Sequence, residues 1–200
     1  GHVPDFPGQT RTVRYMGVFG PLARSVADLE TALRIIAGPD GNEAEAAPVP
    51  LGPTPAFKPK DLRIAVLDSN PLVRVSADTA AVVLAIARLL GKAGAKVRRA
   101  EPVAFNWQQS WDDWSDLLQY EIRALQPLAE RERFFARTDA ADPSVRSVAR
   151  AARLDMAQFF AVLDRRDRVI RQCEALLDDY DAWLMPVMPG AAFIRQKSNE

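Results

Sequence analysis

The sequence predicts an α/β fold in which a mixed or parallel β-sheet is flanked by helices. An apolar run at residues 62–67 (LRIAVL) is followed by a helical pattern at 77–92 and by a second strand at 95–100 (AKVRRA). Two strands joined by a helix form a parallel pair with a right-handed crossover. A further apolar run at residues 182–187 (AWLMPV) indicates a third, buried strand near the end of the chain.

The composition is that of an ordinary globular chain and excludes several classes of partner. Of the 200 residues, 48% are hydrophobic and 26% are charged, and 26 Lys and Arg balance 26 Asp and Glu. A chain without net charge has no global field that attracts nucleic acid or an anionic membrane. No apolar run reaches the length of about 18 residues that a membrane span needs, and the sequence opens without a signal segment. We therefore expect a cytoplasmic protein with no nucleic-acid and no membrane partner.

The scarcest residue types limit the chemistry. His2 is the only histidine and Cys173 is the only cysteine. A Ser-His-Asp triad needs an imidazole beside the nucleophile, and a zinc site needs a cluster of three or four ligands. A single cysteine also excludes an internal disulfide and fits a reducing compartment. We assign no catalytic, no cofactor-binding and no metal-ligating residue to this chain, and we expect no cofactor.

The first expected helix has a signal at each end. Residues 1–20 are rich in Gly and Pro and indicate a loop. Ser25 is placed to cap the helix, and Asp28 lies in its positive first turn. Gly38 favours the left-handed conformation after the last turn, and Pro39 cannot continue the helix. The apolar positions recur at helical spacing: Val26, Leu29, Leu33, Ile36 and Ala37.

The middle of the chain alternates connections with regular elements. Residues 38–59 are rich in Pro, Ala and Glu without periodicity, which indicates an extended surface connection. The strand at 62–67 leads to the helix at 77–92, and the strand at 95–100 is expected to be more exposed. The predicted inner face of this helix consists of Val82, Ile86, Leu89 and Leu90.

The rest of the chain is predicted to be mostly helical. Asp142 and Pro143 mark a break, after which residues 144–178 form one long or two short helices. The apolar positions of the helix before the break are Trp107, Trp111, Trp114, Leu117, Leu118 and Ile122. The stripe after the break consists of Met156, Phe159, Phe160, Leu163, Ile170, Cys173 and Leu177.

Several side chains have two readings. Arg24 stands at a helix N-terminus against the dipole, so we expect a buried anchor with a compensating partner rather than a solvated arginine. Ser25 is interpreted as a cap and not a nucleophile, because no base lies within sequence reach.

The side chains of the later helices also have two possible roles. The three tryptophans at 107, 111 and 114 either line an acyl or aryl pocket or, as we favour, pack in a core or interface. The acids Asp112, Asp113 and Asp116 are interpreted as a solvated face rather than a metal cluster, and Cys173 as a small core residue. The arginines between 146 and 171 are offset by acids, which disfavours an RNA patch.

Four stretches resemble amidase signature enzymes. Residues 20–41 (GPLARSVADLETALRIIAGPDG) resemble the stretch that follows the catalytic core in that family. The strand LRIAVLD at 62–68, the turn and strand GKAGAKV at 91–97, and LLDDYDAWLMPVMPGAA at 176–192 agree in order and spacing. The resemblance extends from Val3 to about Ala192, and it implies that the sheet is part of an amidase-signature-like fold.

The resemblance also implies where the chemistry lies. Enzymes of this family use a serine nucleophile, a second serine on a cis peptide and a lysine, in segments before the GPLARS-type motif. Residues 1–19 contain no serine, and none of the five lysines matches the catalytic one: Lys58, Lys60, Lys92, Lys96 and Lys197. The resemblance thus implies a single partial amidase domain over 1–200, truncated at its start. Its parts are a post-catalytic loop and helix (1–37), the Pro-rich connection (38–60) and an α/β and helical remainder (61–200).

Three functions follow as hypotheses. We favour a fragment of an enzyme that hydrolyses non-peptide amide C–N bonds of small molecules to carboxylate and ammonia or amine, with its catalytic residues outside this chain. The isolated chain is then expected to be inactive, and a homodimer is the candidate assembly of the full enzyme. One alternative is the amidotransferase subunit of the same family, although residues 12–19 lack its Ser-Leu-Asp-like run. The other alternative is a noncatalytic α/β binding or scaffold module.

Overall fold

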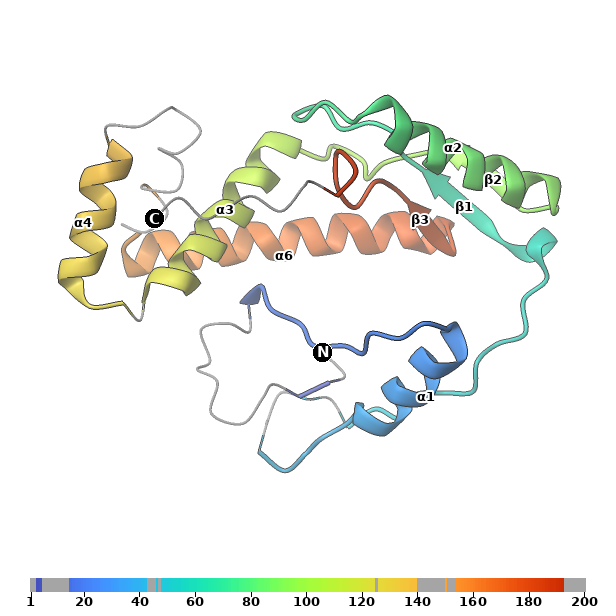
Figure 1. Cartoon of the computed structure of the whole chain (residues 1–200), viewed down its shortest axis with the longest axis horizontal. Helices are drawn as coiled ribbons and strands as arrows, with labels where there is room; N and C mark the ends of the chain where they lie inside the picture. The colour runs from blue at the N-terminus through green and yellow to red at the C-terminus, as the bar shows by residue number, and fades with distance from the viewer. Residues whose placement is uncertain are drawn as a thin grey trace. The chain divides into compact units, whose positions relative to one another are not determined.

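The computed structural model describes residues 3–4, 15–42, 46, 48–124, 126–139, 150 and 154–192 (Figure 1). The chain divides into two compact units. Unit 1 comprises Gly1–Pro55 and Asp112–Val162, and unit 2 comprises Ala56–Trp111 and Leu163–Glu200. The assignment of residues 1–200 to one partial domain stays a prediction. The elements are α1 (Val26–Ile36), η2 (Pro59–Asp61), β1 (Arg63–Val66), α2 (Ala77–Lys92), β2 (Lys96–Arg99), α3 (Trp107–Ala124), α4 (Leu128–Asp139), α6 (Met156–Asp179) and β3 (Ala182–Leu184).

Unit 2 contains a three-stranded parallel sheet in the order β2-β1-β3. The register aligns Ile64 of β1 with Val97 of β2 on one side and with Ala182 of β3 on the other. The prediction of an α/β fold with all three strands in one sheet is confirmed. The strand-helix-strand unit from β1 through α2 to β2 is also confirmed.

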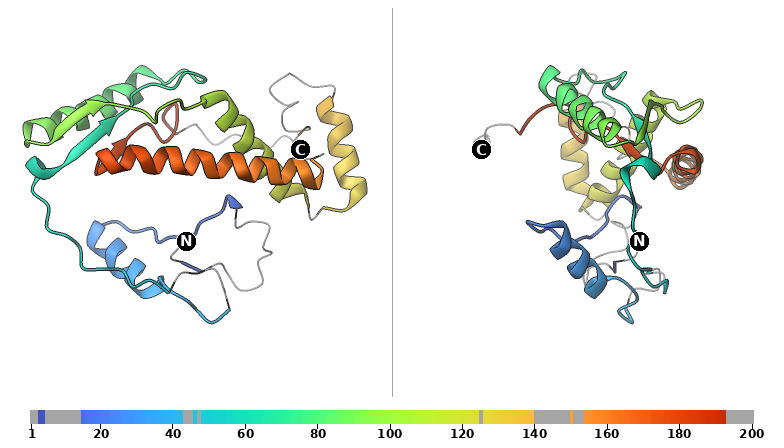
Figure 2. Two further views of the ribbon diagram at one scale, coloured as in Figure 1. Left: turned by 180° about the vertical axis from the view of Figure 1, so that it is seen from behind. Right: turned by 90° about the vertical axis from the view of Figure 1, so that its right-hand side faces the viewer.

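Both faces of the central strand are covered. Ile64 and Val66 point to one face and join Val83 and Ala87 of α2 in the core of this unit. Ala65 and Leu67 point to the other face and are also buried. Figure 2 shows α2 on one side of the sheet and α6 on the other. A parallel strand buried on both faces is apolar at its buried positions, which explains the uninterrupted apolar run from Ile64 to Leu67 after the exposed Arg63.

The inner face of α2 differs from the predicted one. Val83 is 5% exposed, whereas Val82 is 59% and Leu89 is 65% exposed. Leu90, the fourth predicted position, does pack against the core. The helix carries apolar residues around most of its circumference, so periodicity alone could not decide which of two neighbouring stripes faces the sheet. The prediction for Val82, Ile86 and Leu89 is therefore wrong.

Helix α1 of unit 1 begins and ends as predicted. The Ser25 hydroxyl accepts a hydrogen bond from the N–H of Asp28 at 3.1 Å. Gly38 has a φ of +107°, the left-handed conformation that follows many helix ends. No residue of α1 is buried, and both Val26 and Ile35 are largely exposed. The apolar stripe of this helix is thus only weakly covered.

The prediction that this part of the chain is mostly helical is confirmed, but several of its predicted apolar positions are exposed. Leu117 of α3 is buried, but Trp111, Trp114 and Ile122 are exposed. On α6, Phe159 is buried and stacks on Tyr120, with ring centroids 4.4 Å apart. The buried neighbours along α6 are Val162 and Leu176, while four predicted positions are exposed: Met156, Phe160, Ile170 and Leu177. The predicted break at residues 142–143 lies outside the described residues.

Candidate functional site

Ligands of open α/β sheets bind at the carboxyl ends of the parallel strands. Asp68 and Ser69 follow β1, and Arg99 ends β2. The Arg99 guanidinium forms an ion pair with Asp68 and donates a hydrogen bond to Ser69 Oγ at 2.8 Å. A guanidinium stays protonated and accepts no proton, so it cannot activate the serine. This cluster holds two strand ends together and provides no nucleophile with a base.

Hydrogen bonds that involve main-chain groups hold the loops at the same end of the sheet. Asn70 Oδ1 accepts hydrogen bonds from the N–H groups of Leu72 and Val73 at 2.8 and 3.2 Å. Ser76, the N-cap of α2, donates its N–H to the carbonyl of Pro189 at 2.7 Å. The loop after β1 is therefore joined to the loop after β3, which orders this end of unit 2.

An arginine and an aspartate close the opposite end of the sheet. The Arg63 guanidinium contacts Asp181 Oδ1 at 3.0 Å, and Asp181 Oδ2 accepts the Arg63 main-chain N–H at 2.7 Å. The hydrogen bonds from Arg63 hold the pKa of Asp181 below its usual value, and Asp181 in turn raises the pKa of Arg63. Local sequence signals do not predict this pair. An arginine beginning one strand and an acid preceding another would have indicated it once the parallel register was known.

In unit 1, Arg34 ties the Pro-rich connection to α1. Its Nη2 contacts Glu30 Oε1 at 2.8 Å and the carbonyl of Gly52 at 3.2 Å. The Thr54 hydroxyl also donates to Glu30, and the hydrogen bonds from Thr54 and then Arg34 lower the pKa of that carboxyl. Beside this cluster lies an open cavity of about 500 Å³, with Val26 and Pro53 among its mostly apolar walls. Glu30 and Thr54 also line this cavity, but their side-chain oxygens are engaged with each other and with Arg34.

The acids of α3 are placed differently from the prediction. Asp113 and Asp116 are 3% and 4% exposed, so their assignment to a solvated face is wrong. Arg150 contacts Asp116 Oδ1 at 3.0 Å, but burial outweighs this pairing and raises the pKa of Asp116. The two acids lie three residues apart and flank the same helix face as buried Leu117, a spacing that could have revealed them. Among the described residues, no group of three or more His, Cys, Asp or Glu could hold a metal ion.

The remaining side chains that the sequence singled out are not brought together as a site. Arg24 is exposed, so its prediction as a buried anchor is wrong, because α1 has no core around it that would bury a charge. Trp107 donates its indole N–H to Glu101 at 3.0 Å. Cys173 is a free, half-buried thiol whose pKa is raised by burial, and it does not lie in the core. His2 and Lys197 lie outside the described residues.

The comparison with family models identifies the chain. The model described as Amidase matches residues 1–200, and the chain belongs to the amidase family. A relative in Bradyrhizobium diazoefficiens, described as an indoleacetamide hydrolase, is 28% identical over 193 residues, which cover 93% of this chain and 35% of that protein. The chain thus spans about a third of the length of this curated relative.

Solved structures support the fold. A fatty acid amide hydrolase superposes with a TM-score of 0.72 at 19% identity, covering 96% of this chain and 35% of that one. A 6-aminohexanoate cyclic dimer hydrolase, solved with its substrate, gives a TM-score of 0.55 at 22% identity over 79% of this chain and 34% of that one. The small parallel sheet flanked by helices therefore corresponds to part of the amidase signature fold. No helix in the described part of the chain is long and apolar enough to cross a membrane.

Proposed function

We propose that this chain is the post-catalytic portion of a hydrolase that cleaves the C–N bond of small-molecule amides. The observation that carries the proposal is the match of the Amidase family model to the whole of residues 1–200. The relatives support hydrolysis in particular, since each is described as a hydrolase and two as acting on amides. They favour this reading over an amidotransferase subunit and over a noncatalytic module.

The catalytic residues belong, in this proposal, to sequence other than residues 1–200. Hydrolysis of an amide needs a nucleophile, a proton acceptor and an oxyanion site within hydrogen-bond reach of one another. Ser25 caps α1, Ser69 faces the Arg99 guanidinium, and Ser76 caps α2. These three serines already have structural partners that cannot act as a base. Residues 1–200 then supply scaffold and pocket wall.

The test is to read the coding sequence upstream of Gly1 and express the longer reading frame. We expect a Gly/Ser-rich segment with two serines and an upstream lysine, and a product that releases ammonia or amine from small aliphatic and aryl amides. Replacing either serine should lower that rate by several powers of ten, on the order of 10⁶ for a serine nucleophile. A longer product that contains no such segment, or that remains inactive on these amides, would contradict the proposal.

A further inference from the structure

A cavity in unit 1 lies where α3 ends and α4 begins, and it is not part of the clusters described above. Its volume is about 520 Å³, which is the size of a small-molecule site. Its wall combines charged, polar and apolar side chains: Arg123, Gln126, Glu130, Arg133, Phe134 and Ala136. All six belong to the same compact unit, so the cavity is formed within one part of the chain.

Arg123 is held in a fixed orientation on the wall of this cavity. Its guanidinium lies over the Phe134 ring, 3.3 Å from the ring centroid. Its Nη1 also donates a hydrogen bond to Gln126 Oε1 at 3.1 Å, in a partly buried position. A guanidinium that is stacked and hydrogen-bonded is already ordered, so a ligand that meets it immobilises little further side chain.

Arg133 supplies the group that can bind an anion. Its Nε donates a hydrogen bond to the carbonyl of Ala129 at 3.1 Å, one turn earlier in α4, which holds the guanidinium beside the helix. Among the residues that the structure describes, its two terminal amino groups have no hydrogen-bond or ion-pair partner. Paired N–H groups of an arginine match the two oxygens of a carboxylate.

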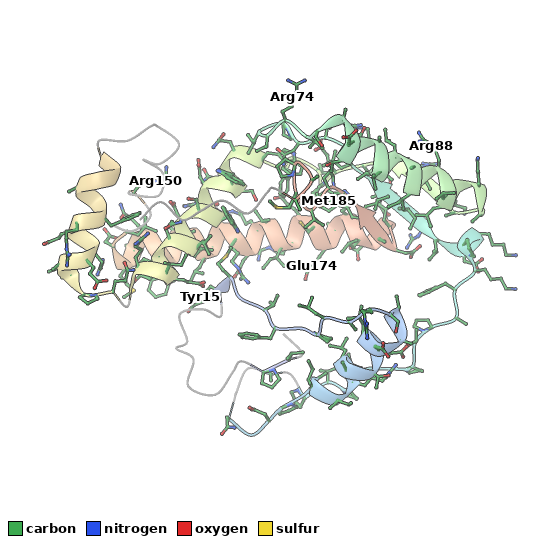
Figure 3. All side chains as sticks on the ribbon, in the orientation of Figure 1. Tyr15, Arg74, Arg88, Arg150, Glu174 and Met185 are labelled. Carbon is green, nitrogen blue, oxygen red and sulfur yellow. The ribbon has the colours of Figure 1, made fainter. Side chains whose placement is uncertain are left out.

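The charges around the cavity favour a monoanion. Glu130 is the one acid in the wall as far as the structure describes it, and it is exposed. Two arginines against one glutamate leave this wall with one net positive charge. Arg150, which lies between α4 and α3 in the view of Figure 3, already pairs with Asp116. The charge that remains to be neutralised is therefore that of the cavity wall itself.

We propose that this cavity binds a small aromatic carboxylate. The Arg133 guanidinium takes the carboxylate through two N–H···O hydrogen bonds, and the ligand ring packs beside Phe134 and Ala136. An aromatic ring suits this wall, because it interacts favourably both with another aromatic ring and with a guanidinium such as that of Arg123. The inference goes beyond the proposed hydrolysis and concerns binding alone, so a failure of either one leaves the other standing.

The first experiment measures whether the charge of the ligand decides binding. Phenylacetate is titrated into residues 1–200, with phenylacetamide as a neutral control of the same size, and amide shifts are followed by NMR. Phenylacetate should shift the amides of Arg133 and Phe134 saturably, with a dissociation constant roughly tenfold below that of phenylacetamide, because charge-assisted hydrogen bonds are the stronger ones. Equal affinities for the two compounds, or no saturable shift with phenylacetate, would overturn the proposal.

The second experiment replaces the charged side chains one at a time. Arg133→Gln should weaken phenylacetate binding roughly tenfold. Arg24→Gln, at an exposed position of the same unit outside the cavity, should leave it unchanged. Glu130→Gln should tighten binding by about twofold, since it removes a negative charge beside the ligand.

Three results of the second experiment contradict the assignment. The first is unchanged affinity in Arg133→Gln, and the second is weaker binding in Glu130→Gln. The third is tighter binding of phenylalanine than of phenylacetate, because Glu130 would then pair with the ammonium group of an amino acid.

Discussion

Arg63 and Asp181 connect the first and last strands of the sheet through both side chain and main chain. Asp181 accepts the Arg63 main-chain N–H at 2.7 Å and the guanidinium at 3.0 Å. The two residues are 118 positions apart in sequence. Since β3 has only three residues, this contact at its amino end is a large part of what holds it beside β1. The same pairing makes Asp181 more acidic than an ordinary aspartate.

Replacing Asp181 by Asn should destabilise unit 2 in a pH-dependent way. Because the folded-state pKa of Asp181 is lowered, its contribution to the free energy of unfolding is present above the unfolded-state pKa. That contribution is lost as the pH falls below about 4 and through the lowered folded-state pKa of Asp181. Urea unfolding between pH 3 and 7 should show wild type and Asp181→Asn converging at low pH. Asp164→Asn, at an exposed position of α6 in the same unit, is the control, and a constant difference between wild type and Asp181→Asn at all pH values would contradict the account.

Two neighbouring valines test which face of α2 meets the sheet. Val83→Ala should lower the free energy of unfolding by about 1–3 kcal/mol, because it removes buried methyl groups from the core around Ile64. Val82→Ala removes the same atoms from an exposed position, so it should change the free energy of unfolding by less than about 0.5 kcal/mol. Chemical unfolding of both variants gives the comparison. A larger loss for Val82→Ala would restore the face predicted by periodicity.

Ser25 should behave as a helix cap and nothing more. Ser25→Ala should cost about 1 kcal/mol of local helix stability and Ser25→Gly only a few tenths, because glycine at this position leaves the first turn accessible to water. Amide exchange of Asp28 and Leu29 in the first turn of α1 measures this loss. Unchanged exchange of these amides in Ser25→Ala would mean that the hydroxyl does not cap the helix.

Asp116 should give the opposite pH dependence from Asp181. Burial raises its folded-state pKa, so the charged form is disfavoured and the stability of unit 1 should fall as the pH rises through that value. Asp116→Asn removes the charge and should flatten this decline, although it weakens the contact with Arg150. Unfolding monitored from pH 3 to 8 tests this, with Glu132→Gln at an exposed position of α4 in the same unit as the control. If stability falls equally with rising pH in Asp116→Asn, another titrating group causes the pH dependence.

The elements were predictable where local signals and apolar runs coincide. Ser25 and Gly38 mark the ends of α1, and the strand at 62–67 is predictable because Ile64 to Leu67, which are buried on both faces of the sheet, are all apolar. The choice between Val82 and Val83 was not predictable, because both lie within a helix that is apolar on most sides. The packing partner, which decides the buried face, comes from residues far away in sequence.

The charged residues were harder to place than the elements. Arg24 was expected to be buried because its charge opposes the helix dipole, but a solvated arginine needs no protein partner. Asp116 was expected to be solvated, yet it is buried and pairs with Arg150, a half-exposed arginine 34 residues away. Whether a charge is buried depends on such long-range partners, and neither helical spacing nor composition records them.

The most direct measurement of the central claim is the activity of residues 1–200 by themselves. The purified chain is incubated with simple aliphatic and aryl amides, ammonia release is recorded, and a serine-reactive fluorophosphonate probe is applied in parallel. The account predicts release at the uncatalysed rate and no labelled serine, because it places the nucleophile and its base in sequence other than residues 1–200. Turnover well above the uncatalysed rate, abolished by replacing one serine of this chain, would contradict the claim that the catalytic residues lie elsewhere.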